Sequence, residues 1–267
     1  MAQQRQLTIA DQRAVTPRLR WLTLHAPELA HAVRAGQYLL IRCAEDGSYD
    51  PLLRRPLFVA AAEPALGQIG LLYEPAERGL GWLARGRASD ELDVLGPFGH
   101  PFELDGRTRS LLLIGAGPGL AALLLLARAA AARNCAITLL AGADAADLLP
   151  PPFLLPGEVE YQTFMPLQIA DFRLQIEAGN SQSANYNLQS AIGWADQLCV
   201  ALPRTQLVDL ATIIRRVKYR WARGFASALL EGPLICGVGA CGVCALNLRK
   251  GSRMLCSDGP VFDLLLI

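Results

Sequence analysis

Cys236-Gly-Val-Gly-Ala-Cys241-Gly-Val-Cys244, followed after residues 245–255 by Cys256, contains four of the seven cysteines of this 267-residue chain. The Cys-x4-Cys-x2-Cys spacing with one distant cysteine is the plant-type ligand pattern of a two-iron, two-sulfur cluster. Glycines inside the first loop allow backbone N–H groups to approach the cluster sulfurs without side-chain clashes. We therefore predict that these four cysteines ligate a 2Fe-2S cluster.

Two other cysteine chemistries compete with this interpretation. Four cysteines also suit tetrahedral zinc, but structural zinc sites usually combine two short Cys-x2-Cys pairs, and this stretch has one. A disulfide framework fits poorly with an odd cysteine count and with an N-terminus that lacks the layout of a signal peptide. Cys43, Cys135 and Cys199 stand alone in apolar surroundings, so we predict buried free thiols and a reducing, cytoplasmic location.

The overall composition narrows the functional classes. Apolar residues make up 52% of the chain, and the net charge is +1, so electrostatics do not predict nucleic-acid binding. The uncharged stretch Leu111–Ala127 approaches the length of a membrane span, but Gly115–Gly119 interrupts it. A strand, a glycine turn and a buried helix explain this stretch better, so we predict no membrane span.

The first hundred residues alternate short apolar segments with turn residues, which is typical of a small antiparallel β-barrel. The predicted strands are Leu7–Ala14, Arg18–His25, Ala35–Arg42, Pro56–Ala61, Ile69–Tyr73 and Glu91–Leu95, with a short helix at Gly81–Arg85 and a turn at Gly96–Gly99. Arg54 and Arg55 before the rigid Pro56 are either a solvent-facing basic pair or a fixed guanidinium site for a diphosphate. The glycine-rich turn Glu77–Gly81 adds a second candidate anion site.

The middle of the chain begins as a βαβ unit. A buried strand from Ser110 enters the loop Gly115-Ala-Gly117-Pro-Gly119, and the predicted helix Leu120–Arg133 and strand Cys135–Ala141 follow. Such a loop lies at the carboxyl end of its strand and can receive a dinucleotide, so Gly115, Gly117 and Gly119 are candidate cofactor-binding residues. Further on, we predict a polar loop at Glu177–Ser190, a helix at Gln206–Arg216 and a strand at Phe225–Leu230.

These motifs, in this order, resemble the ferredoxin reductase-type flavoproteins. The residues that bear the resemblance are Gly36-Gln37-Tyr38, Arg55-Pro56-Leu57, Gly79-Leu80-Gly81, Gly96–Gly99 and the final Cys256-Ser-Asp-Gly-Pro-Val-Phe262. Together with the cysteine stretch, they most closely resemble the electron-transfer subunit of class IB dihydroorotate dehydrogenase. The resemblance implies an FAD-binding β-barrel over residues 1–105, a Rossmann-like parallel α/β domain over 106–222, and a 2Fe-2S module over 223–267.

The resemblance also implies site residues. Arg55 would contact the FAD diphosphate, and Gly79 and Gly81 would cradle phosphate with Leu80 in place of a usual hydroxyl residue. The flavin would lie along Pro56, Leu57, Phe58, Leu72, Tyr73 and Glu74. Phe58 stands where the family usually has a serine or threonine that serves flavin N5. Asp144 after the second strand favours NAD over NADP, because a carboxylate repels a 2′-phosphate.

Several functions remain open at this point. The first is a relay of electrons between NAD and a partner FMN subunit that oxidises dihydroorotate in pyrimidine biosynthesis, within a heterotetramer. The second is a cluster-bearing scaffold or carrier that has lost nicotinamide binding, because Cys199-Val-Ala-Leu-Pro203 replaces the family's Cys-Gly-Pro. A related NAD(P)H-dependent reductase subunit is the third. No residue is predicted to be catalytic, and the basic stretch Arg215–Arg223 is either a solvated face or a docking surface.

Overall fold

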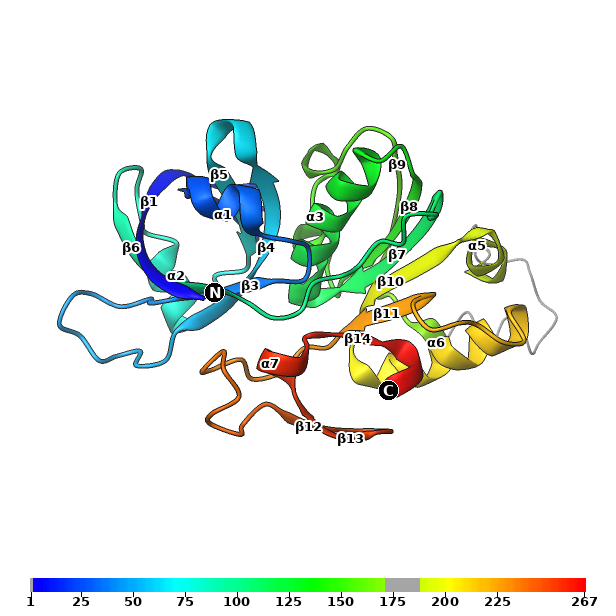
Figure 1. Ribbon diagram of the computed structural model, residues 1–267. Coiled ribbons are helices and arrows are strands. Elements are labelled where there is room, and N and C mark those ends of the chain that lie inside the picture. The colour runs from blue at the N-terminus through cyan, green and yellow to red at the C-terminus, as the bar shows by residue number, and fades with distance from the viewer. Residues whose placement is uncertain (1, 171–187) are drawn as a thin grey trace.

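The structure, a computed structural model, describes residues 2–170 and 188–267. Six antiparallel strands form a closed barrel in the N-terminal part of the chain, coloured blue to cyan in Figure 1. In chain order they are β1 (Gln3–Ala14), β2 (Arg20–His25), β3 (Tyr38–Ile41), β4 (Arg55–Glu63), β5 (Gln68–Tyr73) and β6 (Glu91–Phe98), and around the barrel they pair in the order β1-β2-β5-β4-β3-β6. The predicted barrel is confirmed.

Packing inside the barrel follows from the pleat of its strands. Leu22 and Leu24 of β2 and Tyr38 of β3 are fully buried, because alternate side chains of a strand point to the same face. On the adjacent strand β5, a Cβ atom at Gly70 would lie 2.2 Å from the Trp21 ring. The glycine therefore makes room for the indole, a close approach that only a residue without a side chain permits.

Two short helices accompany the barrel. The sequence analysis did not predict α1 (Pro27–Ala32), and α2 (Arg78–Leu83) begins three residues earlier than the predicted helix at Gly81. The earlier start has a physical cause, because the Glu77 side chain accepts hydrogen bonds from the first free N–H groups of α2. The predicted turn at Gly96–Gly99 is also wrong in part, since β6 continues to Phe98 and Gly96 pairs with Gln3 of β1.

The second layer of the molecule is a six-stranded sheet with the order β14-β11-β10-β7-β8-β9. Its strands are β7 (Ser110–Ala116), β8 (Ala136–Gly142), β9 (Val159–Phe164), β10 (Gln197–Ala201), β11 (Ala226–Leu229) and β14 (Val261–Asp263). All neighbours pair in parallel except β14, which is antiparallel to β11. The predicted Rossmann-like domain is confirmed, and in β7 the residues Leu111 to Ile114 are all fully buried, as expected for a parallel sheet covered on both faces.

Helices pack on this sheet at α3 (Leu120–Ala131), α5 (Leu188–Trp194) and α6 (Arg204–Val217). The predicted helices at 120–133 and 206–216 are confirmed with small shifts of their ends. Most of the predicted loop Glu177–Ser190 lies outside the described residues, and its last residues, from Leu188, belong to α5 instead. Within the described part of the chain, no helix is long and apolar enough to cross a membrane.

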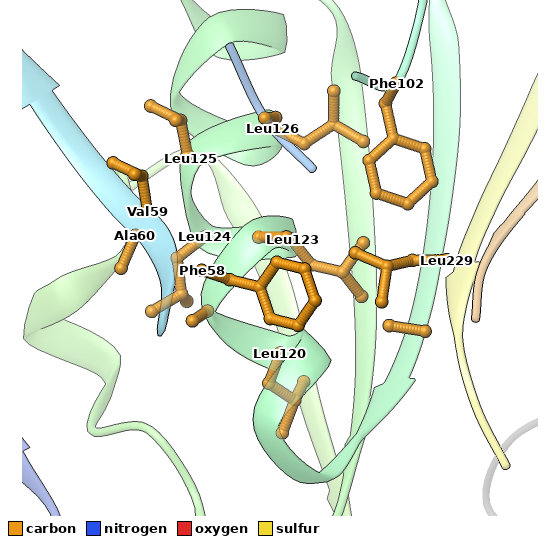
Figure 2. Packing of buried hydrophobic residues seen from close by; sticks show 14 of the residues in the cluster. Phe58, Val59, Ala60, Phe102, Leu120, Leu123, Leu124, Leu125, Leu126 and Leu229 are labelled. Atoms are coloured by element: carbon orange, nitrogen blue, oxygen red, sulfur yellow. The ribbon is translucent and has the colours of Figure 1, made fainter. Parts of the chain in front are cut away.

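The barrel and the sheet meet along β4 and α3. Figure 2 shows Phe58 and Val59 of β4 beside Leu120 and Leu124 of α3, within one continuous cluster of buried apolar side chains. Burial of this kind contributes about 25 cal/mol per Å² of apolar area, so the two layers are held together by a shared core. The carboxyl ends of β7 and β8 therefore face the barrel wall formed by β4 and β5.

The C-terminal segment lies beneath both layers, in orange and red in Figure 1. After β11, the chain forms the loop over residues 236–244 that carries Cys236, Cys241 and Cys244, here called the cysteine loop. The hairpin of β12 (Ala245–Leu248) and β13 (Gly251–Met254) and the short helix α7 (Leu255–Asp258) follow. It then returns to the sheet as β14. Residues on both sides of the cysteine loop thus join the sheet, which fixes the loop against the rest of the molecule.

The basic stretch Arg215–Arg223 makes local contacts at the end of α6. The Arg215 guanidinium lies 5.5 Å from the centre of the Trp221 ring, and Lys218 Nζ lies 4.7 Å from that of Phe225. Cation–π contacts of this kind fix part of the positive charge in the local packing. The sequence leaves two interpretations of this surface, a solvated face and a docking surface for an acidic partner, and these contacts do not decide between them.

Candidate iron–sulfur centre and cofactor cleft

The four cysteines of the C-terminal segment come together in two pairs. Cys244 and Cys256 are both buried, with their sulfur atoms 3.3 Å apart. Cys236 is half-buried, and the exposed Cys241 is among the groups that lower the pKa of its thiol. Two thiolates for each of two irons is the donor set of a 2Fe-2S cluster, whereas a zinc ion requires four donors around one point. Among residues 2–170 and 188–267, no three His, Cys, Asp or Glu side chains are grouped to hold a single metal ion.

Backbone N–H groups surround these sulfur atoms. The N–H of Cys241, helped by those of Val238 and Ala240, donates to Cys236 and lowers the pKa of its thiol to about 6, against the opposing effect of burial. The N–H of Gly239 donates to Cys256 Sγ over 3.1 Å. Gly237 and Gly239 have φ angles of +74° and +75°, a region that glycine enters without strain. This local backbone conformation aims the N–H groups inward, as hydrogen bonding to a cluster requires.

Cys256 has the opposite electrostatic environment. Burial, together with the neighbouring Cys244 thiol, raises the pKa of Cys256 to about 12. A buried thiol of this kind becomes a thiolate when a metal ion supplies the compensating positive charge. The site therefore provides one exposed and one buried pair of thiols, with hydrogen-bond donors already directed at both pairs.

A cleft of about 530 Å³ lies between the barrel and the sheet. Its barrel wall includes six of the predicted flavin-binding residues and Leu80, and its sheet wall includes residues of the glycine loop and the loop after β8. The predicted residues that line it are Pro56, Leu57, Phe58, Leu72, Tyr73, Glu74, Leu80 and Gly117, and Asp144 lines it as well. Two regions that the sequence analysis treated separately, the barrel and the glycine loop, thus share one cavity.

Arg55, at the edge of this cleft, forms an ion pair with Glu77. The guanidinium donates from Nε and Nη2 to the two Glu77 carboxylate oxygens, both over 2.8 Å. The same carboxylate accepts from the backbone N–H groups of Gly79 and Leu80, at 3.0 and 2.7 Å. Arg55 and these donations hold the pKa of Glu77 at about 2, well below the usual range of a glutamate. The residues of the predicted diphosphate fork and of the predicted phosphate cradle therefore converge on one carboxylate, that of Glu77.

Gly81, Gly115 and Gly119 are not among the residues that line this cleft, and each makes contacts within the fold. Gly81 donates its N–H to the Glu77 carbonyl in the first turn of α2. A Cβ atom at Gly115 would lie 2.6 Å from Leu123, so this glycine allows α3 to pack closely on β7. Gly119 stands at the start of α3, and its N–H donates to the Glu231 carboxylate over 2.8 Å.

The sequence analysis missed two acidic residues of the cleft, Glu77 and Glu231. Glu77 directly precedes α2 and caps its first N–H groups, although Ser, Thr, Asp and Asn are the residues preferred at this position. Glu231 lies two residues after the end of β11 at Leu229, where the carboxyl ends of parallel strands gather in a nucleotide-binding sheet. Its side chain is exposed to the cleft yet surrounded by protein on most sides, and this desolvation raises the pKa of its carboxyl group.

Known proteins that are similar to this chain identify its family. The family model described as the iron-sulfur cluster binding domain of dihydroorotate dehydrogenase B matches residues 231–266. The chain is 32% identical over 97% of its length to the dihydroorotate dehydrogenase B (NAD(+)) electron transfer subunit of Shouchella clausii, covering 96% of that protein. The chain belongs to this family of electron transfer subunits. The subunit of the same name from Geobacillus thermodenitrificans is 29% identical over 96% of the chain and 95% of the relative.

Solved structures agree with this family in fold. The NADH-dependent reduced ferredoxin-NADP oxidoreductase structure matches with a TM-score of 0.74 at 22% identity, covering 97% of the chain and 88% of its own. Phthalate dioxygenase reductase, described as a modular structure for electron transfer from pyridine nucleotides to [2Fe-2S], matches with a TM-score of 0.58 at 15% identity, covering 95% and 94%. This chain therefore has the ferredoxin reductase-like arrangement of barrel, sheet and cluster segment.

Proposed function

We propose that this chain relays electrons between a partner dihydroorotate-oxidising FMN subunit and NAD, through a 2Fe-2S cluster and FAD. The observation that supports this most strongly is the shared cleft, in which the barrel wall and the glycine loop face each other. Two cofactors bound on opposite walls of one cleft would meet at its centre. The cluster accepts one electron at a time, and a flavin links such steps to the two-electron hydride chemistry of NAD.

The residues present fit these groups. The Arg55 guanidinium and the N–H groups of Gly79 and Leu80 already bind an oxyanion, the Glu77 carboxylate. An FAD diphosphate at the cleft edge would take over some of these donors. Phe58 would present a ring to the flavin where the family usually has a hydroxyl, so a hydrogen bond to N5 would have to come from elsewhere. At Gly119, the phosphates of NAD would have to displace the Glu231 carboxylate.

The cysteine segment packs against the barrel at the end of β6. The backbone at Gly99 meets Pro260 so closely that a Cβ atom at Gly99 would lie 2.5 Å from Pro260 Cδ. Cys241 is exposed at the surface of the segment, where a partner subunit could approach the cluster. We propose that the partner docks on this face, that the complex is a heterotetramer, and that the protein acts in the cytoplasm. The proposed domain division remains 1–105, 106–222 and 223–267.

Anaerobic addition of NADH to the purified chain tests the relay. We expect the absorption bands of flavin and cluster to bleach together, because NADH would reduce the flavin and the flavin would pass single electrons to the cluster. Bound flavin that NADH does not reduce would contradict hydride exchange with NAD. Purification of the chain together with a dihydroorotate-oxidising subunit would test the partner.

A second candidate function is a carrier that retains the cluster and FAD but does not bind NAD. The Glu231 carboxylate supports this second function. It accepts the N–H of Gly119 at the start of α3, and its negative charge repels phosphate. The altered Cys199–Pro203 stretch supports it too, since Pro203 lines the cleft. Titration of the chain with NADH separates the two functions, because the carrier would show no saturable binding.

Arg55→Gln should weaken FAD binding about 10- to 100-fold, because a hydrogen bond to a charged group contributes about 1.5–3 kcal/mol. The change also leaves the Glu77 carboxylate unpaired and able to repel the diphosphate. The flavin content after gel filtration at low concentration measures the effect. Arg54→Gln is the matched control, because the neighbouring Arg54 donates to Asp93 over 2.6 Å, away from the cleft. Equal flavin loss in both variants would show that Arg55 has no specific role.

A further inference from the structure

Three buried aromatic side chains connect the cofactor cleft with the cysteine segment. The Tyr38 ring lies 6.0 Å from the Phe58 ring, edge-on at 72°, and 5.8 Å from the Phe98 ring at 31°. These are the separations of interacting aromatic pairs. None of the three side chains is more than 7% exposed. Tyr38 on β3 therefore stands between Phe58 on β4 and Phe98 on β6.

The two ends of this aromatic series reach different sites. Phe58 lines the cleft in which the flavin is proposed to bind. Phe98 packs on the cysteine loop, where a Cβ atom at Gly237 would lie 2.5 Å from Phe98 Cε1. Gly237 follows Cys236 directly, so the Phe98 ring packs on the residue next to the first proposed cluster ligand. The three rings therefore lie between the proposed flavin site and the proposed iron–sulfur cluster.

The hydroxyl group of Tyr38 has no hydrogen-bond partner in the described part of the chain, although it is fully buried. Burial, followed by the nearby thiols of Cys256, Cys244 and Cys236, raises the pKa of this hydroxyl group. It therefore stays protonated at neutral pH and is a hydrogen-bond donor. A buried donor without an acceptor is unfavourable. The Tyr38 ring packs on Gly99, which also meets Pro260 of the segment that carries Cys256, and the thiols of Cys256, Cys244 and Cys236 are the groups that act on the Tyr38 hydroxyl.

We propose that Tyr38 is a positioning residue of the iron–sulfur centre, whose hydroxyl donates a hydrogen bond to a sulfur of the cluster or of its ligand cysteines. This inference rests on the proposed function only in assigning a 2Fe-2S cluster to the four cysteines. Reduction adds one electron, and so one negative charge, to the cluster. A donor aimed at its sulfurs stabilises the reduced state more than the oxidised one and raises the reduction potential.

A redox titration of the cluster, followed by electron paramagnetic resonance on the full chain, tests the proposal without NADH or a partner. In Tyr38→Phe, the ratio of reduced to oxidised cluster at a fixed solution potential should fall about tenfold, equivalent to about 59 mV for one electron. Tyr161→Phe is the matched control, because the Tyr161 hydroxyl already donates to the Pro150 carbonyl over 2.8 Å in the sheet domain. Its ratio should equal that of the wild type.

A second measurement avoids dependence on the folding of the variant. Incorporation of 3-fluorotyrosine into the wild-type chain makes each phenol a stronger donor, so the cluster potential should rise. An unchanged potential in both Tyr38→Phe and the fluorinated protein would overturn the proposal. A chain that shows no cluster signal in any form would instead contradict the cluster assignment itself, so the two failures are distinguishable.

Discussion

Cys256→Ala is expected to reduce the cluster content of the purified chain to less than about a tenth of the wild-type level. Even groups that only support metal ligands change affinity by 10- to 100-fold, and Cys256 is proposed as a direct ligand. Its sulfur lies 3.3 Å from Cys244 Sγ and accepts the N–H of Gly239. Loss of this thiol leaves one iron with a single cysteine ligand. Because Cys256 is buried, no solvent-exposed thiol lies at this position to replace it.

The absorption and paramagnetic resonance spectra of the reduced protein measure this loss. Cys199→Ala serves as the matched control, because Cys199 is also a fully buried free thiol but lies within β10. Both substitutions remove one buried sulfur atom, so a general loss of stability would affect them alike. Wild-type cluster content in Cys256→Ala would refute the ligand assignment, as would an equal loss in Cys199→Ala.

The cysteine spacing shows how far the sequence can predict this site. Cys-x4-Cys-x2-Cys and one distant cysteine were enough to propose the ligand set, because the ligands nearly all lie in one loop. The pairing of Cys244 with Cys256 was not predictable from spacing. It depends on the hairpin β12–β13, which returns the chain so that Cys256 lies beside Cys244.

The cleft was predictable only as two halves. Period-two segments indicated the barrel, and the apolar run before Gly115 indicated the buried strand β7, since both patterns are local. That the two halves share a cavity depends on the packing of Phe58 and Val59 against α3, a contact between residues far apart in the chain. Glu231 was missed for the same reason, because the fold brings the N–H of Gly119 to its carboxylate. Glu77 differs, since its N–H donors, Gly79 and Leu80, are its neighbours in the sequence.

Glu231→Gln is expected to strengthen NADH binding about tenfold. The Glu231 carboxylate accepts the N–H of Gly119 over 2.8 Å, at the position where a glycine loop ordinarily meets a pyrophosphate. An incoming phosphate must displace this carboxylate and overcome its charge. Replacement by a neutral amide removes the repulsion, and a hydrogen bond to a charged group contributes about 1.5–3 kcal/mol, roughly a tenfold or larger change in affinity.

The pH dependence of binding gives a sharper test of the same carboxylate. Desolvation raises the pKa of Glu231, with the Gly119 hydrogen bond opposing it, so Glu231 takes up a proton at a higher pH than an ordinary glutamate. As the pH falls toward that raised pKa, the wild-type chain loses the negative charge at Gly119 and should bind NADH more tightly. The affinity of Glu231→Gln should lack this component, because the amide does not titrate.

The comparison with Glu231→Gln is essential because other carboxylates face the same cleft. Glu74, Glu77 and Asp144 all line it, and their charges act on NADH in both proteins. The difference between the two binding curves therefore isolates Glu231. Fluorescence titration of the FAD-loaded chain with NADH across a pH series measures it. Weaker binding in Glu231→Gln at every pH would mean that the carboxylate turns away from Gly119 and holds the nicotinamide or a ribose hydroxyl, so that it recognises NAD instead of excluding it.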